Sequence, residues 1–194
     1  MSKKNSPWMI GLTGPILSGK STALAYFKAQ GAQVISCDDL VRQLYARPAV
    51  LKQIEKRLGT SDQKELAARI FENKTARKQL EQILHPQILK EIRARVKQST
   101  REWVVVEIPL LFEAGWEKQT DLTICILADP KTLSARLKER KLSKAEYTRR
   151  LKTQLSPEEK AARADVVFMH ATKAQLKKSV TRFCNVFKVV HKVT

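Results

Sequence analysis

Residues 14–21 read Gly-Pro-Ile-Leu-Ser-Gly-Lys-Ser, which fits the phosphate-binding pattern G-x-x-x-x-G-K-[ST], the P-loop. Residues 8–13 before it predict a short buried strand, and residues 21–27 predict a helix. In this order the backbone N–H groups of the loop and of the helix N-terminus point at one anion. Lys20 is then expected to reach the β- and γ-phosphates of a nucleotide, and the Ser21 hydroxyl to bind Mg²⁺.

Two residues are unusual for this motif. Pro15 follows Gly14 and supplies no N–H donor, and Leu17 lies where many small-molecule kinases carry Gly. The N–H groups of residues 17–21 remain, and they provide most of a phosphate cradle. A decayed loop that only packs is the alternative interpretation, but the Gly-Lys-Ser end of the motif is intact.

Carboxylates follow two of the predicted strands. Asp38 comes after the strand at residues 33–36, and ligands of open α/β sheets bind outside the carboxyl ends of strands. Asp38 could orient an attacking hydroxyl or support Mg²⁺; alternatively it only caps the next helix together with Ser36, and a cap is the favoured interpretation for Asp39. Glu107 ends the third predicted strand like the acid of a Walker B motif, or it is merely an exposed or ion-paired acid.

Arginines and one histidine provide further candidates. Arg136 and Arg140 are spaced i, i+4 and share a helix face. Phosphoryl transfer spreads negative charge over the equatorial oxygens, and arginines placed there stabilise it. A solvated charged surface is the alternative. His85, in the sequence Leu-His-Pro, is a weaker candidate, because a lone histidine is more often structural. The same basic segment also contains Arg149, Arg150 and Gln154.

A framework of alternating strands and helices must position these residues. Five short segments rich in Val and Ile predict strands, at residues 8–13, 33–36, 103–108, 122–127 and 165–169. They mostly lack apolar-polar alternation, which is typical of strands buried on both faces. Helical segments separate them, and this order favours a parallel sheet covered by helices.

Further helices are predicted in three stretches, at residues 39–98, 130–162 and 172–186. Gly59 and Pro86 are expected to break the first stretch into several helices. Ser143 and Ser156 are expected to be N-caps that interrupt the second, strongly basic stretch.

The 194 residues carry a formal net charge of +18, and residues 131–194 alone hold 17 Lys and Arg against 5 Asp and Glu. Such a charge attracts a phosphorylated substrate with ATP, or a nucleic acid; simple solvation of helix faces is the third interpretation. No apolar run approaches the roughly 20 residues of a membrane helix, and a cleaved signal peptide would remove the loop. Three distant cysteines indicate reduced thiols of a cytosolic protein.

Several segments together match one family. They are Ile10-Gly11-Leu12-Thr13-Gly14, Ser18-Gly19-Lys20-Ser21-Thr22, Asp38, Arg42, Leu84-His85-Pro86, Pro109-Leu110-Leu111-Phe112-Glu113, Arg136, Arg140, Arg150, Gln154 and Arg163-Ala164-Asp165. On these residues the chain resembles the dephospho-coenzyme A kinase family along nearly its whole length. The P-loop alone indicates only a superfamily, whereas the His-Pro, Pro-Leu-Leu-Phe-Glu and late Arg–Gln signals in this order are more specific.

The resemblance implies an α/β fold: a three-layer α/β/α P-loop NTPase core with a five-stranded parallel sheet, a helical substrate-binding subdomain and a helical lid. Residues 1–194 would form a single P-loop kinase domain. Its core would comprise residues 8–38, 99–135 and 161–194, the substrate subdomain residues 40–98, and the lid residues 136–160.

The resemblance also implies a cytoplasmic enzyme that uses ATP and Mg²⁺ to phosphorylate the ribose 3′-hydroxyl of dephospho-coenzyme A, the last step of coenzyme A synthesis. Expected ATP contacts are Gly14, Leu17, Ser18, Gly19, Lys20, Ser21, Thr22, Arg136 and Arg140, with Ser21 also on the metal. Expected substrate contacts are Asp38, Arg42, His85, Pro109 and Leu110, and the expected catalytic residues are Lys20, Asp38 and Arg140. A monomer or weak homo-oligomer is expected, without a membrane or nucleic-acid partner.

One position departs from the family pattern. The family usually has Asp-x-Asp after the second strand, with the first Asp as favoured base for the 3′-hydroxyl, but here Ser36 takes that place and Asp38 keeps the second. Either Asp38 acts as the base, or proton removal is undemanding because phosphoryl transfer has a loose transition state. Glu107 likewise stands where Asp is common. Another P-loop small-molecule kinase and a non-catalytic polyanion-binding P-loop protein are the competing hypotheses.

Overall fold

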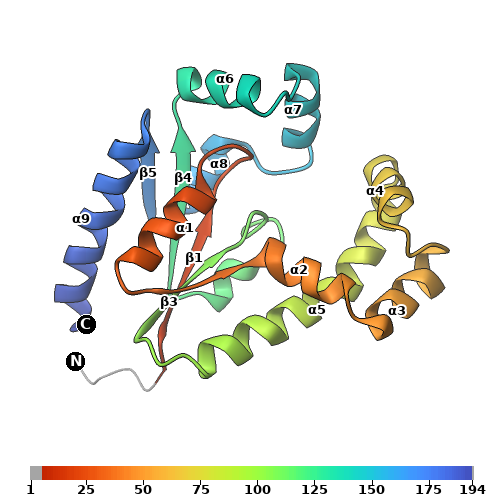
Figure 1. The fold of residues 1–194 in the computed structure, drawn as a ribbon, viewed down its shortest axis with the longest axis horizontal. Helices are drawn as coiled ribbons and strands as arrows, with labels where there is room; N and C mark the ends of the chain where they lie inside the picture. The colour runs from red at the N-terminus through yellow and green to blue at the C-terminus, as the bar shows by residue number, and fades with distance from the viewer. Residues whose placement is uncertain (1–5, 194) are drawn as a thin grey trace. The chain divides into compact units, whose positions relative to one another are not determined.

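A computed structural model describes residues 6–193 of the chain (Figure 1). Within this range, residues up to Ile35 and from Val96 onward form one compact unit, and Ser36–Arg95 form a second. The first unit contains the sheet, whereas the second is helical. Among the residues described, no helix combines the length and apolar character needed to cross a membrane.

Five parallel strands form one sheet in the order β2-β3-β1-β4-β5. They are β1 Trp8–Thr13, β2 Gln33–Ser36, β3 Trp103–Glu107, β4 Leu122–Ala128 and β5 Val166–His170. The predicted α/β fold with a five-stranded parallel sheet is confirmed, although the bounds of β3, β4 and β5 each shift by one residue. Leu12 of the central β1 pairs with Glu107 on one side and Ile124 on the other. The loop after β1 therefore leaves the middle of the sheet's carboxyl edge.

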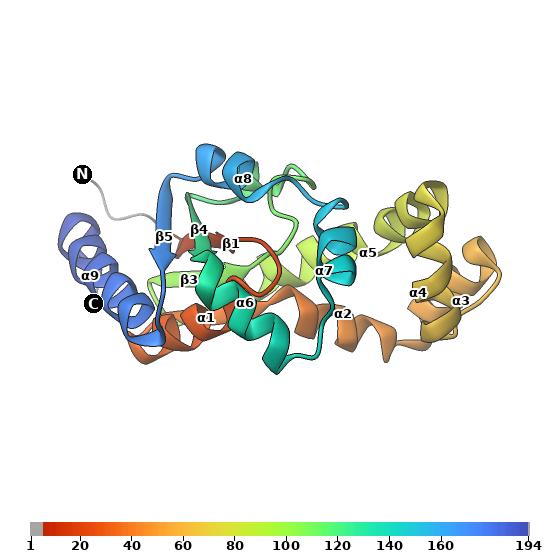
Figure 2. The ribbon, with the colours of Figure 1, turned by 90° about the horizontal axis from the view of Figure 1, so that it is seen from above.

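Helices cover both faces of this sheet. The helices of the first unit are α1 Lys20–Ala29, the 3₁₀ helix η1 Trp116–Gln119, α6 Pro130–Glu139, α7 Lys144–Leu151, α8 Pro157–Arg163 and α9 Lys173–His191. Ile10 and Leu12 belong to the core shared with α1 and α9. Gly11, between them, faces the other way, where a Cβ would lie 3.0 Å from Leu111. Figure 2 shows α1 and α9 on one side of the strands and α8 on the other, the three-layer arrangement predicted.

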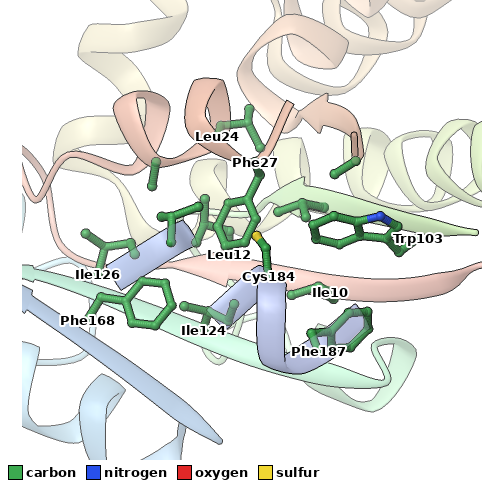
Figure 3. Packing of buried hydrophobic residues seen from close by; sticks show 14 of the residues in the cluster. Ile10, Leu12, Leu24, Phe27, Trp103, Ile124, Ile126, Phe168, Cys184 and Phe187 are labelled. Carbon is green, nitrogen blue, oxygen red and sulfur yellow. The ribbon is translucent and has the colours of Figure 1, made fainter. Parts of the chain in front are cut away.

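Aromatic side chains join α1 and α9 to the sheet (Figure 3). Trp103 of β3 lies between two rings, with centroid distances of 6.1 Å to Phe27 of α1 and 5.5 Å to Phe187 of α9. All three side chains are buried, and burial of such rings contributes about 2–3 kcal/mol each. Because α1 starts inside the Gly-Lys-Ser motif, this packing holds the phosphate-binding loop against the sheet.

Buried thiols give the first testable prediction. Burial raises the pKa of Cys125 in β4 to about 11 and that of Cys184 in α9 to about 12. Both thiols therefore stay protonated at neutral pH, and since thiolate is the reactive form, iodoacetamide is expected to label them only after unfolding. Mass spectrometry with and without urea measures this.

The same shifts carry a pH dependence. Because the pKa of each thiol is higher in the folded state, the unfolded chain loses its thiol protons at a lower pH. The contribution of these thiols to the free energy of unfolding is therefore fully present below pH ~9 and declines as the pH rises further. Urea unfolding at pH 7.5 and pH 10 measures the decline. Rapid native-state labelling of Cys125 would contradict the assignment, and Cys125→Ser is the control for which thiol reacts.

The helices of the second unit correct one prediction. They are α2 Cys37–Tyr45, α3 Pro48–Leu58, α4 Gln63–Glu72 and α5 Lys74–Lys97. Gly59 ends α3 at φ 73°, as predicted, but Pro86 does not break α5, which runs through it. A proline removes one helix hydrogen bond, yet Gln87 Nε2 adds a bond to the Ile83 carbonyl at 3.1 Å. The apolar face of α5 also continues past the proline, with Leu80, Leu84, Ile88 and Ile92 all buried.

The basic segment after β4 is divided into α6, α7 and α8, with the breaks at the two predicted serines. The Ser143 hydroxyl accepts the N–H of Glu146 at 3.1 Å at the start of α7. Ser156 and Glu159 form a reciprocal capping box at the start of α8, with bonds of 3.1 and 2.8 Å. Both serines are confirmed as N-caps.

The last helix is longer than predicted. α9 continues to His191 instead of ending at residue 186. Trp8 of β1 packs on its final turn, with ring centroids 5.8 Å from Phe187 and 4.1 Å from His191. This contact, from the other end of the chain, stabilises the extra turn.

Candidate active site

The loop between β1 and α1 has positive φ at three residues. The angles are 144° at Gly14, 63° at Leu17 and 100° at Gly19. Glycine adopts such angles freely, but Leu17 in the left-handed region costs roughly 1 kcal/mol. Strain of this kind persists only where surrounding contacts hold it, and it is common in ligand-binding loops.

Gly14→Ala is expected to disable this loop. A Cβ on Gly14 would lie 2.3 Å from the carbonyl oxygen of Ile126, a backbone atom of β4. The strand must then shift, so we expect a loss of about 3 kcal/mol or more in the free energy of unfolding, together with loss of ATP binding. Urea unfolding and nucleotide titration measure both.

Gly115→Ala is the matched control for Gly14→Ala. Gly115 also has positive φ, at 68°, but a Cβ there would meet nothing within 4 Å. It is expected to lose only about 1 kcal/mol from backbone strain. Equal losses in the two variants would show that the carbonyl of Ile126 does not matter.

The N-terminus of α1 is open to a ligand. Gly19 is its N-cap, and no side chain caps it within the described chain. The first N–H groups of a helix have no partner inside the helix and carry the positive end of its dipole, so they bind anions. The Ser18 N–H was predicted from the sequence to be one of the donors to phosphate. It instead donates to the Pro15 carbonyl at 3.2 Å. The Ser18 hydroxyl is buried and has no hydrogen-bond partner among residues 6–193.

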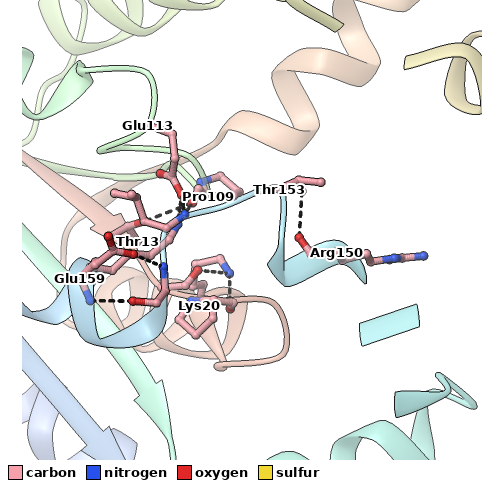
Figure 4. A network of polar contacts seen from close by, with 12 residues as sticks. Thr13, Lys20, Pro109, Glu113, Arg150, Thr153 and Glu159 are labelled. Atoms are coloured by element: carbon pink, nitrogen blue, oxygen red, sulfur yellow. Dashed lines mark hydrogen bonds and ion pairs between the residues drawn. The ribbon is translucent and has the colours of Figure 1, made fainter. Parts of the chain in front are cut away.

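Lys20 lies over the same loop (Figure 4). Its Nζ donates to the carbonyl oxygens of Gly14 and Pro15, both at 2.9 Å. The residue is only 9 % exposed. Hydrogen bonds between ionised groups are stronger than those to a neutral carbonyl, so phosphate oxygens would compete effectively for this ammonium.

A hydroxyl and an acid meet beside the loop. Ser21 Oγ donates to Glu107 Oε1 at 3.2 Å. Glu107 is the last residue of β3 and is 4 % exposed, which favours the Walker-B interpretation over that of an exposed acid. Mg²⁺ at nucleotide sites is usually held by one or two protein oxygens together with substrate phosphates. The hydroxyl and carboxylate here fit that pattern.

Two side chains hold the carbonyl groups of the loop. Arg136 Nη1, from α6, donates to the Leu17 carbonyl at 2.7 Å, and His170 Nε2 lies 2.8 Å from the Ser18 carbonyl. Arg136 thus lies at the loop, as expected of an ATP contact. His170 was missed, and its only sequence signal was its place after the fifth predicted strand. Arg140 is exposed at the end of α6, and its side chain makes no hydrogen bond or ion pair with another described residue.

A buried lysine holds the segment after β3, residues 109–113. Lys160 of α8 is fully buried; its Nζ donates to the Pro109 carbonyl at 2.6 Å and pairs with Glu113 at 2.9 Å. A buried charge is tolerated when it is paired and hydrogen-bonded, and both conditions are met. Pro109 and Leu110 therefore lie on an anchored segment. Lys160 was missed because one lysine in a strongly basic stretch carries no distinguishing signal.

Four residues discussed in the sequence analysis, Ser36, Asp38, Asp39 and Arg42, lie near the start of the second unit. Ser36 caps α2, with its hydroxyl accepting the N–H of Asp39 at 3.4 Å. The sequence had favoured Asp39 as a cap, and this prediction is wrong because Ser36 takes that role. The Asp39 carboxylate pairs instead with Arg42, three residues later. Asp38 is exposed in the first turn of α2, and its carboxylate makes no hydrogen bond or ion pair with any other residue described.

His85 lies within α5 and is partly exposed. Burial lowers the pKa of its imidazole, and the neighbouring carboxylate of Glu81 acts in the opposite direction. The lowered pKa favours the neutral ring, which can both donate and accept a hydrogen bond. Its contact with substrate stays a prediction.

Phosphate binding where a central parallel strand meets a helix is the arrangement of P-loop kinases, and this fold and site place the chain in that class. A shikimate kinase from Bacteroides thetaiotaomicron shares the fold, with a TM-score of 0.54 at 19 % identity. A family model described as dephospho-CoA kinase matches residues 8–175. The chain belongs to the dephospho-CoA kinase family.

Individual relatives agree with this assignment. A dephospho-CoA kinase from Fusobacterium nucleatum is 32 % identical over 91 % of this chain and 96 % of its own length. One from Symbiobacterium thermophilum is 36 % identical, over 91 % of this chain and 81 % of its own length. A crystal structure from Thermus thermophilus superposes with a TM-score of 0.85 at 28 % identity, covering 94 % of this chain and 98 % of its own.

Proposed function

We propose that this chain transfers the γ-phosphoryl group of ATP to the ribose 3′-hydroxyl of dephospho-CoA, which yields coenzyme A and ADP. The observation that carries the proposal is the loop after β1, where the uncapped N-terminus of α1 and the Lys20 ammonium converge on one anion site. Family membership selects the acceptor. The relatives from Fusobacterium nucleatum and Symbiobacterium thermophilum are named for dephospho-CoA.

On the nucleotide side, backbone N–H groups of Gly19 and the first turn of α1 hold the β- and γ-phosphates. Lys20 exchanges its two carbonyl partners for phosphate oxygens, because its Nζ already lies over the loop. As the γ-phosphoryl group leaves, negative charge grows on the β-phosphate oxygens that these donors face. Donors preorganised for that charge lower the barrier.

The basic segment at residues 136–160 is proposed to act as a lid. Its support is the guanidinium of Arg140, which lies on an exposed helix end and has no partner among residues 6–193. Arg136, on the same helix, already contacts the loop. Closure brings Arg140 over the transferring phosphoryl group. Closure also excludes water, which would otherwise compete with the acceptor hydroxyl.

On the acceptor side, Asp38 is proposed to orient or deprotonate the 3′-hydroxyl, because its carboxylate has no other described partner. Arg42 and His85 are proposed substrate contacts on the second unit. Pro109 and Leu110 are proposed substrate contacts on the segment that Lys160 anchors.

Ser21 and Glu107 are proposed to hold Mg²⁺ with the nucleotide phosphates, and a bound Mg²⁺ would neutralise phosphate charge. Glu107→Gln keeps the size of the side chain and its acceptor for Ser21 but removes the charge. We expect it to need about tenfold more Mg²⁺ for half-maximal rate, measured by Mg²⁺ titration at saturating ATP. Glu107→Asp is the control that keeps the charge. An unchanged Mg²⁺ requirement in Glu107→Gln would remove Glu107 from the metal site.

The proposed function is tested by ADP release with ATP, Mg²⁺ and dephospho-CoA, with shikimate, nucleosides and thymidylate as alternative acceptors. The product should gain one phosphate by mass and co-elute with authentic coenzyme A. Turnover with another acceptor alone would identify a different P-loop small-molecule kinase. No turnover, together with steeply salt-dependent binding of duplex nucleic acid, would favour the polyanion-binding alternative.

A further inference from the structure

His170 is the last residue of β5 and is only 2 % exposed. Its Nε2 lies 2.8 Å from the carbonyl oxygen of Ser18, 152 residues earlier in the chain. A carbonyl oxygen can only accept, so Nε2 carries the hydrogen and donates it. The other ring nitrogen, Nδ1, is buried without a hydrogen-bond partner among residues 6–193. The ring's one described hydrogen bond is therefore made to the phosphate-binding loop.

Packing alone does not account for a histidine at this position. A buried polar atom without a partner costs free energy, and an apolar ring of similar size would fill the same space without that cost. The imidazole differs from such a ring only by the bond it donates. The hydrogen bond to the Ser18 carbonyl is therefore the feature that distinguishes histidine from an apolar ring at this position.

The bond holds a peptide group whose two ends point in opposite directions. In a trans peptide the C=O of one residue and the N–H of the next are antiparallel. With the Ser18 carbonyl turned toward His170, the Gly19 N–H is turned away from it. Gly19 is the N-cap of α1, so its N–H lies with those of the first helical turn. Glycine at φ 100° rotates easily, and this peptide therefore needs an outside restraint.

The backbone around His170 is itself anchored. The Asp129 N–H donates to the His170 carbonyl at 3.0 Å. The next residue, Ala171, donates its N–H to Gln175 at 2.8 Å, and its carbonyl accepts the Thr132 hydroxyl. The imidazole thus projects from a support tied to β4, α6 and α9. A rigid support is what a positioning side chain requires.

We propose that His170 is a positioning residue, which holds the Ser18–Gly19 peptide so that the Gly19 N–H faces the phosphates of the bound nucleotide. Arg136 restrains the preceding peptide in a similar way through the Leu17 carbonyl, at 2.7 Å. The inference rests on the proposed function only in that the anion is a nucleotide phosphate. The proposal predicts that loss of His170 weakens binding of the phosphates and leaves contacts with the nucleoside and the acceptor unchanged.

The test uses inorganic tripolyphosphate, which occupies a phosphate cradle but has no nucleoside. Dissociation constants for tripolyphosphate, ATP and dephospho-CoA are measured by calorimetry for the full chain and its variants. His170→Leu, which removes the donor, is expected to bind tripolyphosphate and ATP about 10- to 30-fold more weakly, with dephospho-CoA binding unchanged. His170→Gln places an amide donor near the position of Nε2 and is expected to stay within about threefold of the wild type.

The outcomes separate positioning from stability. Weaker tripolyphosphate binding in His170→Leu with rescue in His170→Gln supports the proposal. Unchanged tripolyphosphate binding overturns it, whether thermal stability falls or ATP binding alone weakens, because the effect then lies in folding or at the nucleoside. Equal loss in both variants also overturns it, since the donor would not matter.

Two provisions keep the test decisive. If His170→Leu does not fold by circular dichroism, the more flexible His170→Met replaces it and is held to the same outcomes. Tripolyphosphate binding needs no acceptor, so a chain that binds ATP but does not phosphorylate dephospho-CoA would refute the proposed function and still decide the role of His170.

Discussion

Lys20→Met is expected to lower kcat for dephospho-CoA phosphorylation by about 10³-fold, at the upper end of the loss for one transition-state donor. Lys20 is the cation of the phosphate-binding loop, and its Nζ lies over that loop between the carbonyls of Gly14 and Pro15. Methionine keeps most of the buried stem but cannot neutralise charge on the β- and γ-phosphates. The rate falls because charge is stabilised less in the transition state.

The matched control for this variant is Lys28→Met. Lys28 lies on the same helix, in its last turn, and is exposed. ADP release, ATP binding and circular dichroism are measured for both variants. Lys28→Met should behave like the wild type. A kcat within tenfold of the wild type in a folded Lys20→Met protein would contradict the assigned role of the ammonium.

Asp38→Asn is expected to lower kcat by about 10²–10⁴-fold, the usual contribution of a general base. The asparagine has the same shape and stays exposed at the start of α2, so the helix is preserved. The carboxylate of Asp38 has no described partner to lose, and the change therefore acts on the reaction and not on the fold. The measurement is kcat at saturating substrates, with KM for dephospho-CoA recorded alongside.

The neighbouring carboxylate supplies the control for Asp38→Asn. Asp39 lies in the same helical turn, but its side chain pairs with Arg42. Asp39→Asn should change kcat by less than about threefold, because an exposed ion pair contributes little. Similar losses in the two variants would show that the local charge matters and that neither carboxylate is the base.

A second substitution tests the departure from the family pattern. Ser and Asp cap helices about equally well, so Ser36→Asp keeps the cap of α2 and adds a carboxylate where the family usually has one. If that position is the better place for a base, Asp38→Asn combined with Ser36→Asp should recover activity over Asp38→Asn alone. No recovery would mean that a carboxylate acts as the base only at position 38.

Much of the site could be predicted from short stretches of sequence. The Gly-Pro-Ile-Leu-Ser-Gly-Lys-Ser motif predicted the loop because its glycines permit positive φ and its last residues begin a helix. Ser143 and Ser156 were predictable as caps because a cap hydroxyl bonds an N–H three residues later. Pro86 was misjudged because a local rule about proline ignores the buried face that carries α5 through it.

Local sequence was enough for the features that neighbours in the chain determine: the short apolar strand segments, the turn glycines, the serine caps and the order of motifs that indicates the family. The pairing of polar groups that lie far apart in the chain, by contrast, became visible only in the folded molecule. It joins Ser18 to His170 over 152 residues, Leu17 to Arg136 over 119 and Pro109 to Lys160 over 51. A donor carries no mark of its acceptor in the sequence, because that pairing depends on where the packed core brings the ends of separate strands and helices.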